Sequence, residues 1–573
     1  MFLLQTMLRI LCVFGAASVL ALNPAERVEN FRLLDSQGSS HELYYFADAP
    51  AFVLMSHSSS CASDDDSVAA FNALQAKYAD AGVEFMMINS SDERDVIRAD
   101  TQHSGVTAPV LMDVTQIIGE SLMLDTTGEM LVIDPSNWSL AYRGNATGGA
   151  IALAQMLDGE TVAETQTAVQ GCAVAFPELK LRSEHAKISY RDEIAPMLEQ
   201  NCVTCHREGG IGPWAMTDYN MIRGFSLMIR EVVRTQRMPP WHADPHYGEF
   251  SNDRSLSAEQ IKTLVHWVEA GAPRGEGEDP LLATRSYPVW ALGEPDVIIE
   301  IPTEDVPATG VVEYKYKMVD NPLNKDVWVR ASEIIPGDRS VLHHVITRFG
   351  TLETEGPRAG RLARRGGGGL GGYVPGAVAR QFPDDTGTFL PADATFEFQM
   401  HYTPSGKAVS DVSRMGIYLY DQPPKYKMEG MIFVNTRIKI PAGAPNHAEK
   451  MERVLPNDVL VYSMLPHSHF RGKASEFVAE YPDGRTETLL SVPRYDFNWQ
   501  TSYQFKEPKF LPAGTKITHR TWWDNSTRNL ANPDATREVP WGRQSWDEML
   551  FGAISFRVLN KEEAPAEVAG GEE

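Results

Sequence analysis

Blocks of hydrophobic and polar residues along the first third of the chain predict strands and helices by turns. The blocks lie between about Phe52 and Gly149, and they are AFVLMS, SVAAFNALQAKYADAG, VEFMMINSS, PVLMD, TQIIGESL, EMLVID and SLAYRG. Strands that alternate with helices are typical of a parallel α/β sheet. We therefore expect an α/β domain over residues 22–172.

From about residue 188 to 272 the hydrophobic period becomes helical. The last helix is the most clearly marked, because Ser257 and Gln260 form a capping box at its start and Gly271 follows its end. Its apolar residues share one face, and they are Ile261, Leu264, Val265 and Val268. This pattern predicts a small all-α domain over residues 180–275.

The remainder of the chain has the pattern of an all-β protein. After a linker rich in Pro, Gly and Glu (276–288), short runs of alternating apolar and polar residues are separated by Pro, Gly and Asn. This pattern is typical of antiparallel strands. The length is enough for two β-sandwiches of the jelly-roll kind, which we place at 289–424 and 425–560. Residues 561–573 have no apolar face and are expected to be disordered.

The first 21 residues have the pattern of a secretory signal peptide. Arg9 precedes an apolar run from Leu11 to Leu20, and the run ends in Val19-Leu20-Ala21, which fits the small-residue rule for cleavage. A membrane anchor would need about 20 apolar residues, roughly twice this run. We expect removal of residues 1–21, a periplasmic or secreted mature protein, and no stable membrane insertion.

Composition and charge narrow the range of partners. Of the 573 residues, 43% are hydrophobic and 22% are charged, which is ordinary for globular domains and excludes a collagen-like, coiled-coil or mostly disordered chain. The 52 Lys and Arg residues against 76 Asp and Glu residues give a net charge of -24. Phosphate backbones and anionic lipid surfaces repel such a chain, so nucleic acid is not an expected partner.

Cys202, Cys205 and His206 form the strongest local motif, Cys-x-x-Cys-His. In an exported protein this is the attachment pattern of c-type haem: two thiols bond the vinyl groups, and the adjacent His ligates the iron. A disulfide or half of a zinc site is the alternative, but no second Cys pair follows and a redox disulfide would not require the His. We expect one covalent haem c.

Met238 is the predicted sixth ligand of the haem iron. It lies on a proline-stiffened loop before the last helix, and a thioether suits electron transfer at raised potential. His242 and His246 are the alternative ligands. The runs MPPWHADPHYGEF and LSAEQIKTLVHWVEAGAP resemble the small c-type cytochromes of multidomain bacterial proteins. In those modules such a Met is the distal ligand.

Further potential metal ligands recur in the β region. Side chains two residues apart in a strand lie on one face, so His467 and His469 could share one metal. The adjacent His343 and His344 would point to opposite faces of a regular strand, so joint ligation would require a bulge or a strand end. Two imidazoles with the Met549 thioether favour copper over zinc, because Met sulfur favours Cu(I).

Several of these motifs also carry a family resemblance. LHHV, QMHYTPSG, MLPHSHFRGK, WWDNSTRNLANPD and VPWGRQSWDEML, spread over residues 290–557, resemble the copper type II monooxygenases that include peptidylglycine α-hydroxylating monooxygenase and dopamine β-monooxygenase. The resemblance implies two copper ions. The electron-storing copper on the first sandwich would be bound by His343, His344 and His401. The oxygen-activating copper on the second would be bound by His467, His469 and Met549.

The chain departs from the peptide-hydroxylating members at three positions. In those relatives an Arg two residues before the His-x-His motif, with an Asn and a Tyr after the Met ligand, holds the substrate carboxylate. The corresponding residues here are Leu465, Phe551 and Ala553. Since a desolvated carboxylate needs a paired charge or fixed donors, we expect a small, apolar or aromatic substrate unless another basic residue replaces the clamp.

The N-terminal segment resembles redoxins but lacks their cysteine pair. It has Cys61 alone near a helix start, and Thr127-Gly128 where a cis-proline usually follows the Thr. Cys172 is the other mature cysteine outside the haem motif, so the two could form a disulfide or remain independent thiols. We expect a degenerate docking or structural module. The order of redoxin, cytochrome c and copper monooxygenase resembles a known bacterial arrangement.

Together these features predict an exported copper monooxygenase that hydroxylates a C–H bond with O2. The haem would receive electrons from an external donor, which could be a periplasmic cytochrome, a cupredoxin or a small reductant, and pass them to the coppers. A non-catalytic copper and haem protein, serving in electron transfer or copper binding, is the alternative. A thiol oxidoreductase is a third hypothesis, which the missing cysteine disfavours.

Overall fold

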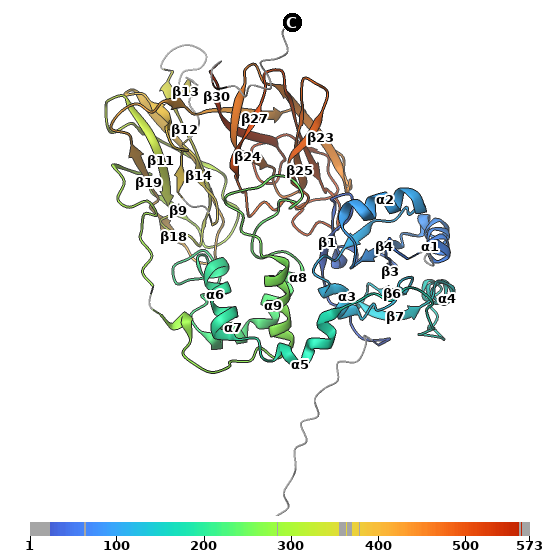
Figure 1. Cartoon of the computed structure of the whole chain (residues 1–573). Helices are drawn as coiled ribbons and strands as arrows, with labels where there is room; N and C mark the ends of the chain where they lie inside the picture. The colour runs from blue at the N-terminus through green and yellow to red at the C-terminus, as the bar shows by residue number, and fades with distance from the viewer. Residues whose placement is uncertain are drawn as a thin grey trace, which may run out of the picture. The chain divides into compact units, whose positions relative to one another are not determined.

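The computed structural model describes residues 23–61, 65–283, 285–353, 362–363, 370–376, 379–560 and 563. These residues form two compact units (Figure 1). Unit 1 contains the chain up to Glu29 together with Phe46–Leu179, and unit 2 contains Asn30–Tyr45 and the chain from Lys180 onward. The predicted signal peptide lies outside the described residues, as does the predicted tail apart from Glu563.

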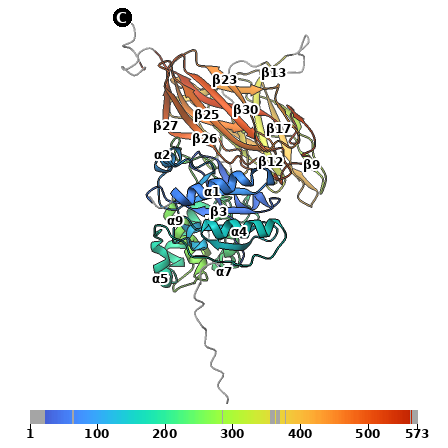
Figure 2. The same ribbon diagram turned by 90° about the vertical axis from the view of Figure 1, so that its right-hand side faces the viewer.

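Unit 1 is built on a five-stranded sheet with the strand order β5-β4-β3-β6-β7. The strands are β3 (Phe52–Ser56), β4 (Glu84–Asn89), β5 (Val110–Met112), β6 (Met130–Asp134) and β7 (Ser139–Gly144). The helices are α1 (Asp65–Lys77), α2 (Arg94–Ser104), α3 (Ile117–Leu122), α4 (Ala146–Leu157) and the one-turn η3 (Ala79–Ala81). The one-turn η1 (Leu43–Phe46) lies at the boundary where the chain passes from unit 2 to unit 1. Helix α4 contacts α1 and strands β6 and β7 (Figure 2).

The sheet of unit 1 is mixed rather than parallel, which corrects the sequence-based expectation. Strands β3, β4 and β5 pair in parallel, but β6 is antiparallel to both β3 and β7. The connection from β6 to β7 is a short turn after Asp134, whereas parallel strands need a crossover of a dozen or more residues. The hydrophobic pattern of a strand does not indicate whether it runs parallel or antiparallel to its neighbours.

A disulfide joins Cys61 to Cys172 in unit 1, which confirms one of the two sequence-based alternatives. Thr127 lies beside both cysteines. Its hydroxyl donates to Sγ of Cys61 at 3.3 Å and accepts the backbone N–H of Cys172 at 2.9 Å. Its own N–H donates to the carbonyl of Cys172 at 2.9 Å. The disulfide and these hydrogen bonds fix the end of unit 1 against its sheet.

The helical part of unit 2 ends in the helix predicted most clearly. The helices are α5 (Arg182–His185), α6 (Ala195–Leu198), α7 (Tyr219–Gly224), α8 (Ser226–Arg234) and α9 (Ala258–Glu269), with the short η4 (Pro177–Leu181), η5 (Tyr190–Ile194), η6 (Glu199–Val203) and η7 (Pro280–Leu282). The capping box of Ser257 and Gln260 is present at the start of α9, and Leu264, Val265 and Val268 are buried.

The first β domain of unit 2 spans β8 to β20. Its strands are β8 (Val297–Glu300), β9 (Glu304–Val306), β10 (Lys315–Asp320), β11 (Val327–Ile335), β12 (Leu342–Leu352), β13 (Leu362–Ala363), β14 (Gly372–Tyr373), β15 (Arg380–Gln381), β16 (Thr386–Leu390), β17 (Ala394–Tyr402), β18 (Val409–Asp411), β19 (Arg414–Leu419) and β20 (Tyr426–Lys427). One sheet has the order β10-β17-β12-β13 and another β20-β16-β11-β19-β8. Phe398 from the former and Val329 and Met415 from the latter share one hydrophobic core.

The second β domain spans β21 to β30. Its strands are β21 (Glu429–Asn435), β22 (Lys439–Ile440), β23 (His447–Val454), β24 (Val459–His467), β25 (Gly472–Glu480), β26 (Thr486–Val492), β27 (Tyr503–Leu511), β28 (Lys516–Trp523), β29 (Val539–Pro540) and β30 (Leu550–Val558). The sheets β21-β30-β24-β27 and β23-β28-β25-β26 bury Met464 and Ile554 against Phe477 in a common core. No cysteine braces either β domain, so these cores hold them together.

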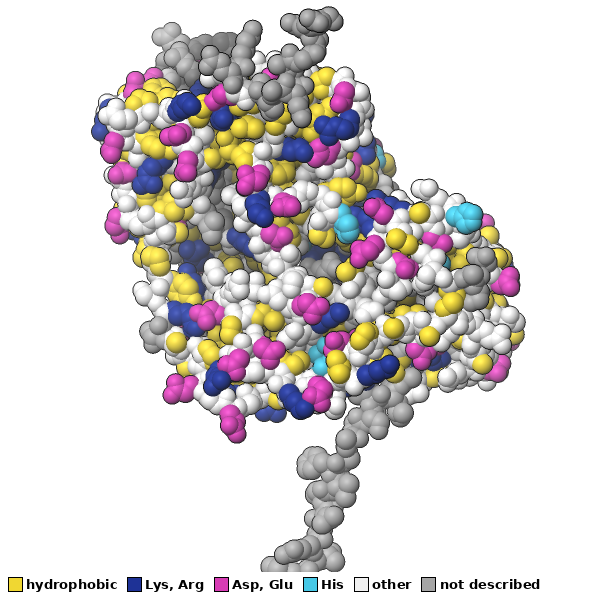
Figure 3. Space-filling model, viewed as in Figure 1, with side chains coloured by type: hydrophobic (Ala, Val, Ile, Leu, Met, Phe, Trp, Pro, Cys, Tyr) yellow, Lys and Arg dark blue, Asp and Glu magenta, His cyan; other side chains and the backbone are white. Residues whose placement is uncertain are grey.

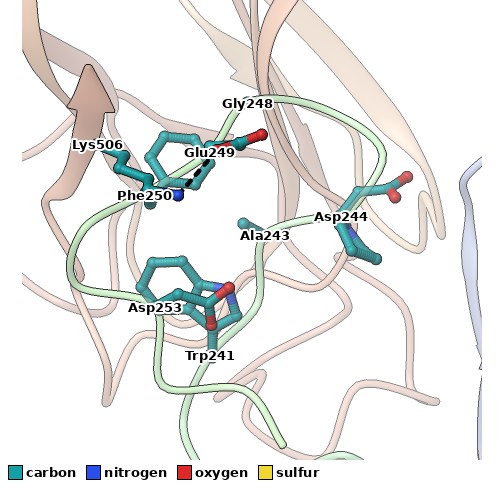
Figure 4. Close-up of a pocket in the computed structure, with 9 residues that line it drawn as sticks. Trp241, Ala243, Asp244, Gly248, Glu249, Phe250, Asp253 and Lys506 are labelled. Carbon is teal, nitrogen blue, oxygen red and sulfur yellow. Dashed lines mark hydrogen bonds and ion pairs between the residues drawn. The ribbon is translucent and has the colours of Figure 1, made fainter. Parts of the chain in front are cut away.

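The loop before α9 packs into the second β domain instead of staying with the helices. Trp241 and Phe250 join its hydrophobic core, and Phe250 forms an antiparallel bridge with Phe505 of β27. An open pocket of about 260 Å³ lies beside this loop, and Figure 4 shows Lys506 paired with Glu249 at its edge. None of the pocket's lining residues is a predicted metal ligand. The helical segment and the second β domain therefore share a core.

The N-terminal hairpin also belongs to unit 2. It consists of β1 (Arg32–Leu34) and β2 (Ser40–Glu42), and Arg32 donates to the carbonyl of Thr235 after α8. Tyr45 donates to Asp524 of the second β domain at 2.6 Å. Acidic, basic and hydrophobic side chains are interspersed over the face drawn in Figure 3. Within the described part of the chain, no helix combines the length and apolar character that crossing a membrane requires.

Candidate metal centres

A β-bulge brings His343 and His344 together. Strand β12 pairs with β17, and the register shifts between Leu342 and His344, so that His343 has no partner on β17. His344 lies directly opposite His401. This is the irregularity that joint ligation by adjacent residues requires, because a bulge re-aims one of two neighbouring side chains.

The ring nitrogens of these three histidines converge. Nδ1 of His344 lies 3.5 Å from Nδ1 of His343 and 3.3 Å from Nδ1 of His401. Two nitrogens that bind one ion at about 2.0–2.1 Å, as imidazoles bind zinc, lie about 3.3 Å apart in a tetrahedral arrangement. Nε2 of His343 and of His344 is also buried, with no hydrogen-bond partner among the described residues. The three imidazoles therefore fit a metal ion.

Burial keeps these imidazoles in the form that binds metal. Desolvation lowers the pKa of His401 to about 3 and that of His344 well below its usual value, with the neighbouring imidazoles adding to the effect. The pKa of His343 is lowered by the same cause. All three are therefore neutral near pH 7 and present a lone pair. Tyr314 packs on this set, with its ring 4.7 Å from that of His401.

A second histidine set lies at the end of β24. His467 ends the strand, His469 follows two residues later, and their ring centroids are 5.3 Å apart. Burial lowers the pKa of His467 to about 4 and that of His469 to about 3, so both are neutral near pH 7. His467 lies opposite Phe551 of β30. Met549 directly precedes β30, so this residue lies at the same end of the sheet as the histidines.

Hydrogen bonds orient both rings of this set. Nδ1 of His467 donates to Oε1 of Gln500 at 2.8 Å, and Nδ1 of His469 donates to the carbonyl of Asp547 at 3.2 Å. Each ring is left with Nε2 as its ligand atom. Glu548, beside Met549, accepts the backbone N–H of His469 at 2.9 Å. Burial raises the pKa of Glu548 to about 7.

The Cys-x-x-Cys-His motif has the local geometry of a haem site. Cys202 and Cys205 are free thiols, and burial raises the pKa of Cys202 to about 12. Nδ1 of His206 donates to the carbonyl of Trp214 at 3.1 Å, which leaves Nε2 for the iron. A Cβ at Gly212 would lie 2.8 Å from the His206 ring, so this turn requires glycine. The residues present fit a covalent haem.

The candidates for the sixth haem ligand differ in their surroundings. Met238 is half-buried on the loop after α8. His242 is buried, and its Nε2 has no hydrogen-bond partner among the described residues. His246 is more exposed, and its Nδ1 pairs with Asp244 at 2.8 Å. The pairing of His246 with Asp244 engages Nδ1 and leaves its Nε2 available. Met238 stays the prediction, with His242 and His246 as its alternatives.

Sequence reasoning missed the segment that contacts both histidine sets. Residues 494–502, which we call the connector, lie between β26 and β27. Phe497 of the connector stacks on His343 at 5.0 Å between centroids and lies 6.0 Å from His469. Gln500 holds His467. The sequence of the connector is typical of a turn between strands. Its Phe, Trp and Gln residues do not form a recognisable metal-binding motif.

The three residues at the positions of the relatives' carboxylate clamp line one apolar face. Leu465 lies opposite Ala553, and Phe551 lies opposite His467 with the two rings 5.8 Å apart. Alternate residues of a strand share a face, so these side chains extend from the second histidine set along β24 and β30. The face supplies hydrophobic contact beside His467.

Comparison with known proteins gives a distant relative for part of the chain. No protein-family model matches. A human protein provisionally named DBH-like monooxygenase protein 2 is 26% identical over 190 residues, which cover 29% of this chain and 38% of the human protein. The chain thus spans well under half of that relative's length.

Several solved structures match about a quarter of the chain, and a thioredoxin domain is among them. The thioredoxin domain of a thiol-disulfide oxidoreductase from Bacteroides vulgatus is 11% identical, with a TM-score of 0.20, and matches 22% of this chain and 89% of its own. A peroxidoxin from Mycobacterium tuberculosis is 16% identical, with a TM-score of 0.22, over 24% of this chain and 97% of its own. A hypothetical protein from Sinorhizobium meliloti is 22% identical, with a TM-score of 0.24, over 27% and 94%.

Proposed function

We propose that the chain is an exported, copper-dependent monooxygenase that hydroxylates a C–H bond of a small, apolar substrate with O2, and that electrons enter through a c-type haem. The observation that carries the proposal is the position of Phe497, which contacts histidines of both sets. Two buried, neutral histidine sets that meet at one side chain favour a two-centre redox enzyme over two unrelated metal sites. The distant similarity to a DBH-like monooxygenase supports the same activity.

Each set would have a separate task. His343, His344 and His401 would hold an electron-storing copper, and their burial limits access of water to it. His467, His469 and Met549 would hold the copper at which O2 reacts. Bound copper supplies one-electron redox chemistry, and the thioether favours its Cu(I) state.

The chain's own residues position the ligands and the substrate. Gln500 and the carbonyl of Asp547 fix the His467 and His469 rings so that their Nε2 atoms stay available. Leu465, Phe551 and Ala553 would hold an apolar substrate by hydrophobic contact beside His467. Their lack of fixed charge favours an apolar substrate over a C-terminal carboxylate.

The haem would connect the protein to its external donor. Cys202 and Cys205 would attach it, and His206 would ligate the iron through Nε2. A periplasmic cytochrome, a cupredoxin or a small reductant would be the external donor, and the haem held by Cys202, Cys205 and His206 would supply one-electron chemistry between this donor and the copper sites. Hydroxylation consumes two electrons and two protons for each O2, with the second oxygen atom leaving as water.

Oxygen uptake separates this proposal from a non-catalytic electron carrier or copper-binding protein. The copper-loaded, reduced protein should consume O2 in proportion to an added apolar substrate, one O2 for each substrate molecule hydroxylated. The His401→Ala variant removes one ligand of the storage site. It should either stop O2 uptake or allow O2 uptake without formation of the hydroxylated product. If no substrate tested changes the rate of O2 uptake, the result would favour a non-catalytic electron carrier and contradict the monooxygenase proposal.

A further inference from the structure

The connector lies between the haem motif and both histidine sets. Trp499 and Cys205 approach the same side of Gly376: a Cβ built there would lie 3.5 Å from Cζ3 of Trp499 and 3.8 Å from Sγ of Cys205. Since both atoms lie within van der Waals range of one point, the Trp499 indole is close to a thiol that would carry the haem. Gly376 of the first β domain thus lies beside both the haem motif and the connector of the second β domain.

Two interactions hold this junction in place. Gly376 has a left-handed backbone conformation, with φ of 75°, which favours glycine. Arg254, which precedes α9, donates to the carbonyl of Gly376 at 2.7 Å. Arg494, at the start of the connector, donates to the carbonyl of Gln236 in the loop after α8. The helical segment is therefore tied to the first β domain at Gly376 and to the connector at Arg494.

Phe497, two residues before Trp499, reaches the copper ligands. Its ring stacks on His343, with centroids 5.0 Å apart and planes 14° apart. It lies 5.9 Å from the ring of His401. Phe497 is 7% exposed, so these ring contacts exclude most water. The backbone turn that links the two aromatic residues is closed by a hydrogen bond from Trp499 to the carbonyl of Asp496.

We propose that Trp499 and Phe497 form the route by which electrons pass from the haem to the copper held by His343, His344 and His401. The proposal rests on the haem and copper assignments of the proposed function. In the step, one electron leaves Fe(II) haem, which becomes Fe(III), and reduces Cu(II) to Cu(I). No bond of the protein forms or breaks. The aromatic side chains are the packed medium between the two centres and are not themselves oxidised.

The test measures electron transfer in the absence of O2 and substrate. In the full chain carrying haem and copper, a light pulse with a flavin photoreductant reduces the haem, and its reoxidation is followed by absorbance. Loss of the Cu(II) signal is followed by electron paramagnetic resonance. Trp499→Leu and Phe497→Leu should each slow haem reoxidation by about tenfold, the effect of about 1.4 kcal/mol on a barrier. Trp499→Phe, which keeps an aromatic ring, should restore much of the rate.

A matched control separates a specific route from general loss of packing. Trp328 and Phe389 form another aromatic pair, with centroids 5.5 Å apart, in the first β domain. Trp328→Leu should leave the rate unchanged. Haem absorbance, haem potential and copper content should be the same in every variant that is compared, so that a lost cofactor or an altered driving force is not mistaken for a lost route.

The outcomes distinguish this proposal from the proposed function. If the unmodified protein binds haem and copper but the haem never reduces the copper, the haem is not the electron input and the proposed function fails at that point. If the unmodified protein transfers electrons rapidly and the Trp499→Leu and Phe497→Leu variants do so equally fast, the route is wrong while the monooxygenase assignment survives.

Discussion

The two histidine sets differ in the ring nitrogen that they present. In the first set three Nδ1 atoms converge. In the second, Gln500 and the Asp547 carbonyl engage Nδ1 of His467 and His469, which leaves Nε2. The difference follows from the backbone, because a bulge aims His343 and a strand end aims His467. It gives the two sites different ligand geometries, which is consistent with the different tasks proposed for two coppers.

Replacement of Met549 by Ala should separate copper binding from turnover. We expect kcat to fall by about 100-fold, because the ligand that stabilises Cu(I) at the oxygen site is lost. Most bound copper should remain, since His467, His469 and the three-histidine site are intact. Copper content and the rate of product formation measure the two effects.

Met431→Ala is the matched control for this variant. Met431 lies on β21 of the same domain and packs against its core. It should alter stability and leave kcat nearly unchanged. Full activity in Met549→Ala, with Met431→Ala also active, would contradict the assignment of Met549.

His519 should make the second β domain sensitive to acid. The side chain is fully buried and stacks on Phe477, and desolvation lowers its pKa to about 4. Between about pH 6.5 and pH 4, His519 is protonated in the unfolded chain but stays neutral in the folded chain. The free energy of unfolding therefore falls as the pH drops from 6.5 to about 4. The loss due to this residue is about 3 kcal/mol. Denaturant unfolding at pH 7 and pH 4 measures it.

The His519→Phe variant provides the comparison for this pH effect. It keeps an aromatic ring against Phe477 and has no proton to gain. The fall in unfolding free energy between pH 7 and pH 4 should be smaller in the variant than in the unmodified protein. An equal fall in both proteins would mean that His519 does not titrate as its burial implies.

The disulfide of unit 1 fastens the end of its fold to the loop after β3. The bond closes a sequence separation of 111 residues, so it removes much of the freedom of the unfolded chain. A loop of that length corresponds to stabilisation by about 5 kcal/mol. Cys61→Ala/Cys172→Ala should lower the midpoint of the unfolding transition of unit 1 in calorimetry. A transition that is the same with and without the bond would contradict this role.

The sequence predicted the individual strands and helices better than it predicted how they pair and pack with one another. The seven apolar and helical runs of unit 1 correspond to β3, α1, β4, β5, α3, β6 and β7, because each run carries its own period. The antiparallel direction of β6 and the insertion of Phe250 beside β27 were missed, since both depend on contacts between distant residues.

The ligands of the site could be proposed from residue types, whereas their supporting residues could not. Several His residues and a Met that occur together in ordered motifs suggest metal ligands, so these residues could be proposed from the sequence. Gln500 and Phe497 are ordinary residues in a turn, and only the fold brings them against His467 and His343. The bulge at His343 was recognised as a requirement, but its position became clear only from the pairing of β12 with β17.

The helical segment and the second β domain share a core, which ties the predicted electron input to the predicted site of chemistry. Trp241 and Phe250 of the helical segment pack with Tyr503, the first residue of β27, which directly follows the connector. A tethered haem of this kind acts at high effective concentration, so electron transfer within one chain should not depend on protein concentration.

Removal of the haem should therefore change which donors support turnover. Cys202→Ser/Cys205→Ser should lose turnover with a cytochrome-type donor and keep turnover with ascorbate, which can reduce copper directly. Copper content and the unfolding midpoint of the variant serve as controls, because the haem segment is packed into the second β domain. Equal activity with both donors would exclude the haem as the electron input.

Incorporation of isotopically labelled O2 decides between a monooxygenase and a protein that only carries electrons. The copper-loaded, reduced protein is incubated with a panel of small apolar and aromatic C–H compounds under labelled O2, and the products are analysed by mass spectrometry. We predict one labelled oxygen atom in an alcohol product, which is absent in His467→Ala/His469→Ala. If O2 is consumed but yields only peroxide or water, with no label in any organic product, the chain is not a monooxygenase of these substrates and the proposed function is contradicted.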